Sequence, residues 1–113
     1  MEIYYLFLMM MISLQKINLN IFIIYLQLMK ILHVIKEHND SRPIEMAELQ
    51  REQGNEVALL MIHDAVLTIP HTDLETFACR DDVIARGTKT DVQLVDYEAI
   101  IRLVFAHDSV TCW

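Results

Sequence analysis

Two patterns of hydrophobic residues divide the chain near Met29. Residues 1–28 are almost continuously apolar, and Glu2 and Lys16 are the only charged side chains among them. From Met29 onward, short apolar runs alternate with polar segments that carry helix-capping residues. We therefore expect an apolar leader over residues 1–28 followed by one domain over residues 29–113. The second segment is long enough to bury a hydrophobic core of its own.

The apolar runs of the domain predict the strands of a parallel sheet. Lys30–Ile35 and Glu56–Ile62 are apolar almost throughout, which is typical of strands buried on both faces. Further strands are expected at Leu74–Cys79, Val92–Val95 and Ser109–Trp113. Since these runs alternate with helical segments, the expected fold class is α/β, a small three-layer α/β/α domain with a mostly parallel sheet of about four or five strands.

Two helices are predicted from their boundary residues. The first begins with a first-turn proline and ends before Gly54. The second covers Val83–Arg86, is capped by Asp81 or Asp82 and ends at Gly87. The inward-facing positions of the first helix are expected at Ile44, Met46, Ala47 and Leu49.

The helix with the clearest pattern is expected over Tyr97–His107. Asp96 is its predicted N-cap, because a carboxylate there accepts hydrogen bonds from the free N–H groups of the first turn. Glu98 and Arg102 are spaced to form an i,i+4 ion pair. His107 lies at the C-terminal end of the helix, where a positive charge interacts favourably with the helix dipole. One apolar stripe is predicted at Ile100, Ile101, Val104 and Phe105.

The net charge of -7 narrows the classes of function. A protein that binds duplex nucleic acid needs a basic surface to neutralise phosphates, so direct nucleic-acid binding by this chain alone is not expected. The two cysteines, Cys79 and Cys112, occur in a chain without a secretory pattern. This favours a reducing, cytoplasmic setting over a disulfide framework.

The leader is a poor match to a membrane span or a signal peptide. Its apolar runs, Ile3–Leu14 and Ile21–Leu28, are joined by a polar segment that a spanning helix would place inside the bilayer. A basic start and a small-residue cleavage site are both missing. The favoured interpretation is that translation begins at Met29 and that the leader is not part of the mature protein. The alternatives are a membrane anchor and an additional packed helix.

Polar residues follow the predicted strands, at the edge where open parallel sheets bind ligands. They are Glu37, His38, Asp40, His63, Asp64, Arg80, Asp81, Asp82 and Asp96. Carboxylates at helix starts stabilise free N–H groups, so we interpret this rim as caps rather than as a metal or acid/base site. The spacings typical of metal sites are missing, and we expect neither a metal nor another cofactor. His33, inside the first strand, is interpreted as a core or interface histidine.

The two thiols are the candidate groups for sulfur chemistry. Cys79 ends a strand, precedes a helix and is followed by Arg80, features that favour a thiolate, whereas the next two aspartates oppose it. A small, buried strand residue is the favoured interpretation. Cys112 could accept or pass sulfur from a mobile terminus, but packing beneath the ring of Trp113 is favoured. No catalytic residue is therefore assigned.

Two segments, Phe77–Gly87 and Val92–Trp113, resemble the TusB/DsrH family. In that family a strand leads into an acidic-start helix that ends in Ala-Arg-Gly. A Val-x-Leu-Val/Ile-Asp-Tyr strand and cap then precede an amphipathic helix and a terminal Trp. The matching residues are Asp82, Ala85, Arg86, Gly87, Asp96, Tyr97, His107 and Trp113. Lys30–Ile35 is similar to the opening strand of the family, so the resemblance covers residues 29–113 and leaves out the leader.

The resemblance implies a subunit of a persulfide sulfur-relay complex. Members assemble with TusC/DsrF-like and TusD/DsrE-like subunits into a hetero-oligomer, which passes sulfur toward 2-thiolation of the tRNA wobble uridine or acts in sulfur oxidation. Some DsrH-type members carry a cysteine in the loop after the first strand, but Lys36–Ser41 has none. This favours a non-catalytic accessory subunit in tRNA processing. The alternatives are a sulfur carrier that uses its own thiol and a membrane-tethered regulator.

Overall fold

The computed structural model describes residues 29–113; the leader, with the expectations attached to it, lies outside the described residues. Five strands form one sheet: β1 (Lys30–Ile35), β2 (Glu56–Met61), β3 (Glu75–Cys79), β4 (Gln93–Val95) and β5 (Ser109–Cys112). The strand order is β4-β3-β2-β1-β5, and every neighbouring pair is parallel. The predicted α/β class is confirmed, and this sheet is parallel throughout.

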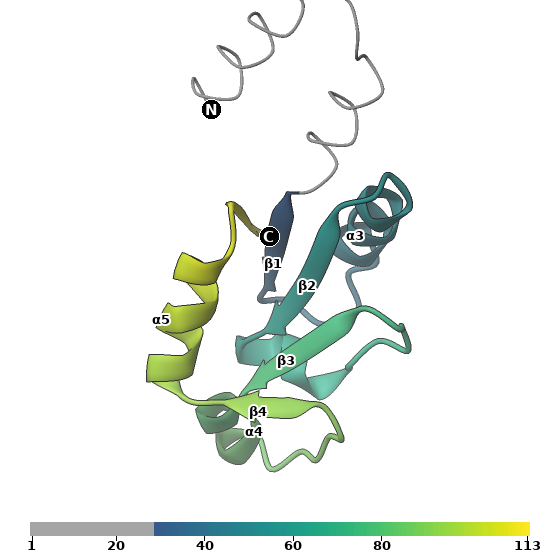
Figure 1. The fold of residues 1–113 in the computed structure, drawn as a ribbon. Helices are drawn as coiled ribbons and strands as arrows, with labels where there is room; N and C mark the ends of the chain where they lie inside the picture. Colours follow the sequence, from purple (N-terminus) through teal and green to yellow (C-terminus); the bar gives the residue numbers. More distant parts are fainter. Residues whose placement is uncertain (1–28) are drawn as a thin grey trace, which may run out of the picture.

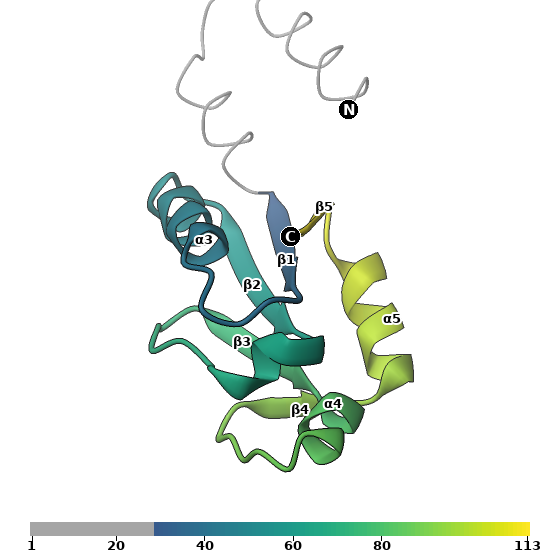
Figure 2. The ribbon, with the colours of Figure 1, turned by 180° about the vertical axis from the view of Figure 1, so that it is seen from behind.

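Helical segments connect the strands and cover both faces of the sheet (Figures 1 and 2). They are α3 (Arg42–Glu52), the 3-10 helix η1 (His63–Leu67), α4 (Arg80–Ala85) and α5 (Tyr97–Ala106). In both views α5 lies on one side of the sheet and α3 on the other. None of the helices within residues 29–113 is long and apolar enough to cross a membrane.

Two apolar clusters form because successive side chains of a strand point to opposite faces of the sheet. The first cluster joins the sheet to α3, η1 and α4 and includes Ile35, Leu59, Ala47, Val66 and Val83. The second joins it to α5 and includes Leu32, Leu60, Phe77, Ile100 and Val104. The domain is therefore layered α/β/α, as predicted, with the central strands buried on both sides.

The start of α4 differs from the prediction. The helix begins at Arg80, directly after β3, and Cys79 occupies the N-cap position. Asp81 and Asp82 therefore lie inside the first turn, and neither is the cap. The reason is that β3 runs into the helix without an intervening loop, which leaves the Asp82 carboxylate free to bind another element.

In α3 and α5, fewer of the residues predicted to face inward are buried than was expected from the sequence. Met46 and Leu49 of α3 are exposed, because this helix contacts the sheet through smaller residues such as Ala47. In α5, Ile101 and Phe105 point outward, while the other half of the predicted stripe faces the sheet. Short amphipathic helices turn only one narrow face to a sheet, so half of a broad apolar surface remains in solvent.

Candidate functional site

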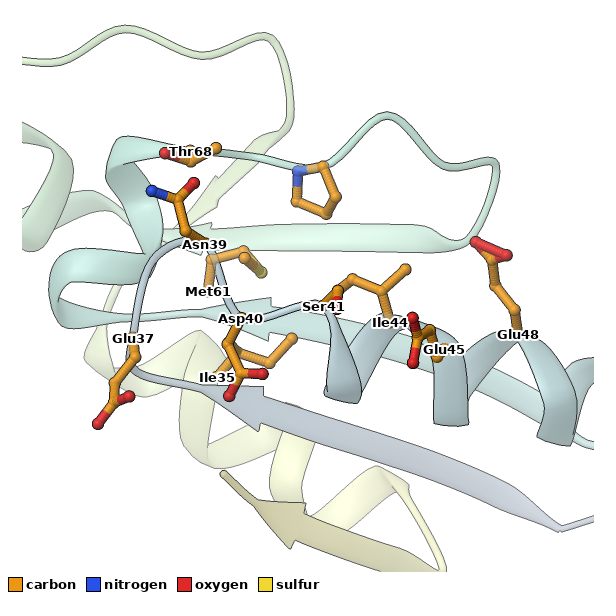
Figure 3. A pocket seen from close by; sticks show the side chains of 11 residues that line it. Ile35, Glu37, Asn39, Asp40, Ser41, Ile44, Glu45, Glu48, Met61 and Thr68 are labelled. Carbon is orange, nitrogen blue, oxygen red and sulfur yellow. The ribbon is translucent and has the colours of Figure 1, made fainter.

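A pocket of about 330 Å³ lies at the C-terminal edge of the sheet, where β1 and β2 end and α3 begins (Figure 3). Its floor is apolar and includes Ile35, Met61 and Ile44. Glu45 and Glu48 lie along one side of it on successive turns of α3. This edge is where open parallel sheets commonly bind ligands, so the pocket is the first candidate site.

Asp40 in the pocket wall is already bound by a neighbouring side chain. Its Oδ1 accepts hydrogen bonds from the backbone N–H of Arg42 at 3.1 Å and from Nε of Arg42 at 2.9 Å. Its Oδ2 accepts a further bond from Nη2 of Arg42 at 2.7 Å. The side-chain bond from Arg42 holds the pKa of Asp40 below its usual range. A carboxylate kept ionised in this way is a poor general acid, so its role is to order the loop before α3.

The lining of this pocket limits the chemistry that it can perform. Its side chains are apolar groups, carboxylates, an amide and hydroxyls; thiol, imidazole and amine groups do not line it. Carboxylates over an apolar floor repel phosphates and accept apolar or positively charged groups. The pocket therefore suits binding, and it lacks the nucleophile that sulfur transfer requires.

A second concavity, of about 760 Å³, runs beside β4 at one free edge of the sheet. Leu67 and Leu94 line it, and these side chains are 46% and 40% exposed. Lys89 and Asp91 provide charges of both signs at the same groove. Exposed apolar side chains in a groove with polar neighbours are typical of surfaces that another chain covers.

Asp82 connects η1 to α4. Its Oδ2 accepts a hydrogen bond from the backbone N–H of His63 at 2.8 Å, and its Oδ1 lies 3.4 Å from Nη1 of Arg86. The Nε of Arg86 also donates to Asp64 at 2.9 Å. His63 has a φ of 51°, which is unfavourable for a residue with a side chain, and the bond to Asp82 stabilises this conformation.

The same contacts keep Asp82 ionised. Burial opposes ionisation, but the His63 N–H, the Cys79 thiol and the Arg86 guanidinium together lower the pKa of Asp82. Two of the residues that carry the family resemblance, Asp82 and Arg86, therefore hold two helices together. Neither residue lines either of the two concavities.

Cys79 lies at the C-terminal end of β3 and is partly buried. Burial raises the pKa of its thiol, and the Asp82 carboxylate beside it contributes to the increase. Backbone N–H groups at the start of α4 act in the opposite direction but do not prevail. Cys79 is therefore a poor thiolate, and burial is the main reason.

Cys112 is exposed, so the expectation that it packs beneath the ring of Trp113 is wrong. The physical reason is strand alternation: Cys112 pairs with Val34 and shares its face of the sheet, whereas Trp113 packs on the opposite face. Cys79 and Cys112 are three strand spacings apart across the sheet order, about 14 Å. Neither thiol can pass sulfur directly to the other across that separation.

His33 is confirmed as a core histidine, with its side chain fully buried. Its Nδ1 accepts a hydrogen bond from the indole Nε1–H of Trp113 at 2.9 Å. Since an indole N–H can only donate, the ring proton of neutral His33 lies on Nε2, which donates to Oε1 of Gln50 at 2.6 Å. This three-residue chain joins the C-terminus to β1 and α3, and sequence reasoning missed Gln50 as its third member.

Two further residues of the resemblance set the ends of helices. Gly87 follows α4 with a φ of 62°, the left-handed conformation that favours glycine at a helix end. The Oδ1 of Asp96 accepts a hydrogen bond from the N–H of Ala99 at 2.8 Å, which confirms the predicted cap of α5. Both residues determine where an element begins or ends.

The remaining residues of the resemblance lie on the surface or at the end of α5. His107 donates from Nδ1 to the carbonyl oxygen of Leu103 at 2.7 Å, and so satisfies a free carbonyl of the last helical turn. Tyr97 and Ala85 are exposed. Nothing in the structure explains the choice of alanine at position 85.

Across residues 29–113, no group of three or more His, Cys, Asp or Glu side chains is arranged to hold a metal ion. The rim predicted from the sequence is thus divided among the Asp40–Arg42 pair, the contacts of Asp82 and the cap at Asp96. Searches against family models, curated proteins and solved structures found no match to this chain.

Proposed function

We propose that this chain is a non-catalytic subunit of a persulfide sulfur-relay complex in the cytoplasm. It assembles with TusC/DsrF-like and TusD/DsrE-like subunits and supports 2-thiolation of the tRNA wobble uridine. The resemblance of Phe77–Gly87 and Val92–Trp113 to the TusB/DsrH family is the source of this proposal.

The observation that carries the non-catalytic role is the state of the thiols. Persulfide transfer needs an accessible thiolate with room for a second thiol in line with it. Burial and Asp82 disfavour the thiolate of Cys79. Cys112 is exposed at the end of an edge strand and lines neither of the two concavities described above.

A role in assembly is supported by the exposed apolar surface. Large apolar side chains are exposed on several elements, including Ile84 on α4 and Leu94 on β4. Apolar side chains that gather in a groove, as Leu67 and Leu94 do beside β4, are typical of a surface that another subunit covers. An acidic subunit also fits tRNA chemistry if another subunit supplies the basic surface.

One observation favours a second candidate. Because Cys112 is exposed, it can meet a thiol on another protein, as a sulfur carrier in an oxidation pathway would require. The two candidates differ in whether removal of this thiol abolishes sulfur transfer.

Assembly is tested by co-expressing the tagged chain with TusC/DsrF-like and TusD/DsrE-like subunits from the same genome. We expect the three proteins to co-purify and to elute together in size-exclusion chromatography at moderate salt. The two other subunits without this chain serve as the control for retention on the resin. Elution of this chain on its own, with the other two proteins folded and present, would rule out the proposed assembly.

A further inference from the structure

The outward face of α5 carries a stripe of three large apolar side chains. Tyr97, Ile101 and Phe105 follow one another at i, i+4 and i+8 and are 73%, 40% and 84% exposed. The neighbouring face of the helix, with Ile100 and Val104, packs on the sheet. The stripe is therefore outside the core of the domain, and water covers it unless another chain does.

Two opposite charges border this stripe on the same side. At about 100° per residue, Glu98 and Arg102 lie next to each other, one helical turn apart, beyond Phe105 around the helix. Their side chains are 83% and 72% exposed, and the Nη1 and Oε2 atoms are 3.9 Å apart. An ion pair this exposed contributes little to the stability of the monomer, so both groups are free to pair elsewhere.

We propose that α5 packs against α5 of a second copy of this chain, antiparallel, around a twofold axis near Ile101. In this arrangement the two Ile101 side chains meet at the axis, and Tyr97 of each copy faces Phe105 of the second copy. A twofold axis of this kind brings the charged border of one helix beside the same border of the other. Glu98 of each copy then lies beside Arg102 of the second copy, and the opposite charges meet twice.

We infer that a second copy of this chain covers the stripe, because the surface of α5 is complementary to itself. The apolar positions are symmetric about Ile101. Glu98 and Arg102 are centred one residue away, so the same operation places each of them beside the opposite charge of the second copy, with an offset of about 3 Å along the helix axis. Isologous dimers require such a self-complementary surface. Val110 of β5 is 37% exposed and pairs with Leu32, whose side chain faces α5, so the apolar surface continues onto the edge of the sheet.

Sedimentation velocity of the full chain over a concentration series tests this dimer. We expect a monomer–dimer equilibrium in the wild type and a dimer dissociation constant at least about tenfold weaker in Ile101→Asp. Glu98→Arg should weaken the dimer, and adding Arg102→Glu should restore it. Ile84→Asp changes the same residue type at a still more exposed position on α4 (69% against 40% for Ile101); it is the control and should change nothing.

Cross-linking tests the twofold geometry even if one charged variant folds poorly. In a Cys79→Ser/Cys112→Ser background, Ile101→Cys should form a disulfide-linked dimer with copper–phenanthroline. Tyr97→Cys alone should not, because the two copies of residue 97 lie about 12 Å apart along the antiparallel helices. Combining Tyr97→Cys with Phe105→Cys should restore cross-linking.

A chain that remains monomeric at every concentration, or a dimer that Ile101→Asp leaves intact, would overturn the inference, whatever else covers the stripe. The inference does not rest on the relay function. A dimer that binds no relay subunit would support the dimer and contradict the relay function. A relay complex that contains one copy of this chain would contradict the dimer and leave the relay function intact.

Discussion

The imidazole of His33 is satisfied by side chains from two distant parts of the chain. Trp113 donates to one ring nitrogen and Gln50 accepts from the other, at sequence separations of 80 and 17 residues. A buried polar group costs free energy unless each of its hydrogen bonds is made. Trp113 therefore stabilises β1 directly, which is a structural role for the Trp of the family resemblance.

Trp113→Phe should lower the free energy of unfolding by about 1–3 kcal/mol. The substitution keeps an aromatic ring but removes the N–H, so Nδ1 of His33 is left buried without a donor. Urea unfolding followed by circular dichroism measures the change. Cys112→Ser, an exposed neighbour on the opposite face, is the control and should stay within about 0.5 kcal/mol of wild type. Equal stability of Trp113→Phe and wild type would contradict the buried role of this hydrogen bond.

At the scale of single residues, the sequence predicted what depends on near neighbours. The N-cap of α5 at Asp96 and the end of α4 at Gly87 depend on residues within a few positions in the sequence, and both predictions are confirmed. The burial of His33 followed from its apolar run. Its partners did not, because only the three-dimensional fold brings Gln50 and Trp113 together. Strand alternation places Cys112 and Trp113 on opposite faces of the sheet, so the exposure of Cys112 was predictable from the sequence. The predicted packing of Cys112 beneath Trp113 considered only that the two residues are adjacent.

At the scale of elements, the junction of η1 and α4 depends on one carboxylate. Asp82 binds the His63 N–H and Arg86, and these contacts keep its pKa low despite burial. The sequence could not assign this role, since Asp81 and Asp82 are equivalent as local capping candidates. The width of the apolar stripe on α5 was undecidable for the same reason: which half faces the sheet depends on how the helix is placed on it.

Asp82→Asn should destabilise the protein by about 1 kcal/mol at neutral pH, because the amide keeps an acceptor but loses the charge. The folded pKa of Asp82 is depressed, so its contribution is present above about pH 4, the ordinary Asp pKa, and is lost as pH falls through the folded value. The difference between wild type and variant should therefore disappear in acid.

Urea unfolding at a series of pH values measures this dependence. Asp81→Asn is the matched control, since Asp81 is an exposed carboxylate in the same turn and lies next to Asp82. A pH-independent effect of Asp82→Asn, or an equal effect of Asp81→Asn, would show that the charge at Asp82 does not hold the junction.

At the scale of the whole molecule, the sheet and helices of residues 29–113 present three surfaces that are open to binding. An acidic pocket lies at the C-terminal edge, an apolar groove at the β4 edge and an apolar stripe on α5. The sequence predicted the layers well, because buried parallel strands have a distinct pattern. It could not predict the pocket and the groove, since each is lined by several elements, or the exposure of the stripe, since that depends on how α5 is placed on the sheet.

The central proposal is that this chain supports a sulfur relay without carrying sulfur. The most direct test is radiolabelled persulfide transfer by the assembled complex containing wild-type chain, Cys79→Ser, Cys112→Ser or the double variant. Size-exclusion chromatography of each complex establishes that assembly is intact. We predict that transfer to the tRNA-modifying acceptor is the same with all four chains. Loss of transfer with Cys112→Ser or Cys79→Ser in a fully assembled complex would contradict the proposal and identify that thiol as a sulfur carrier.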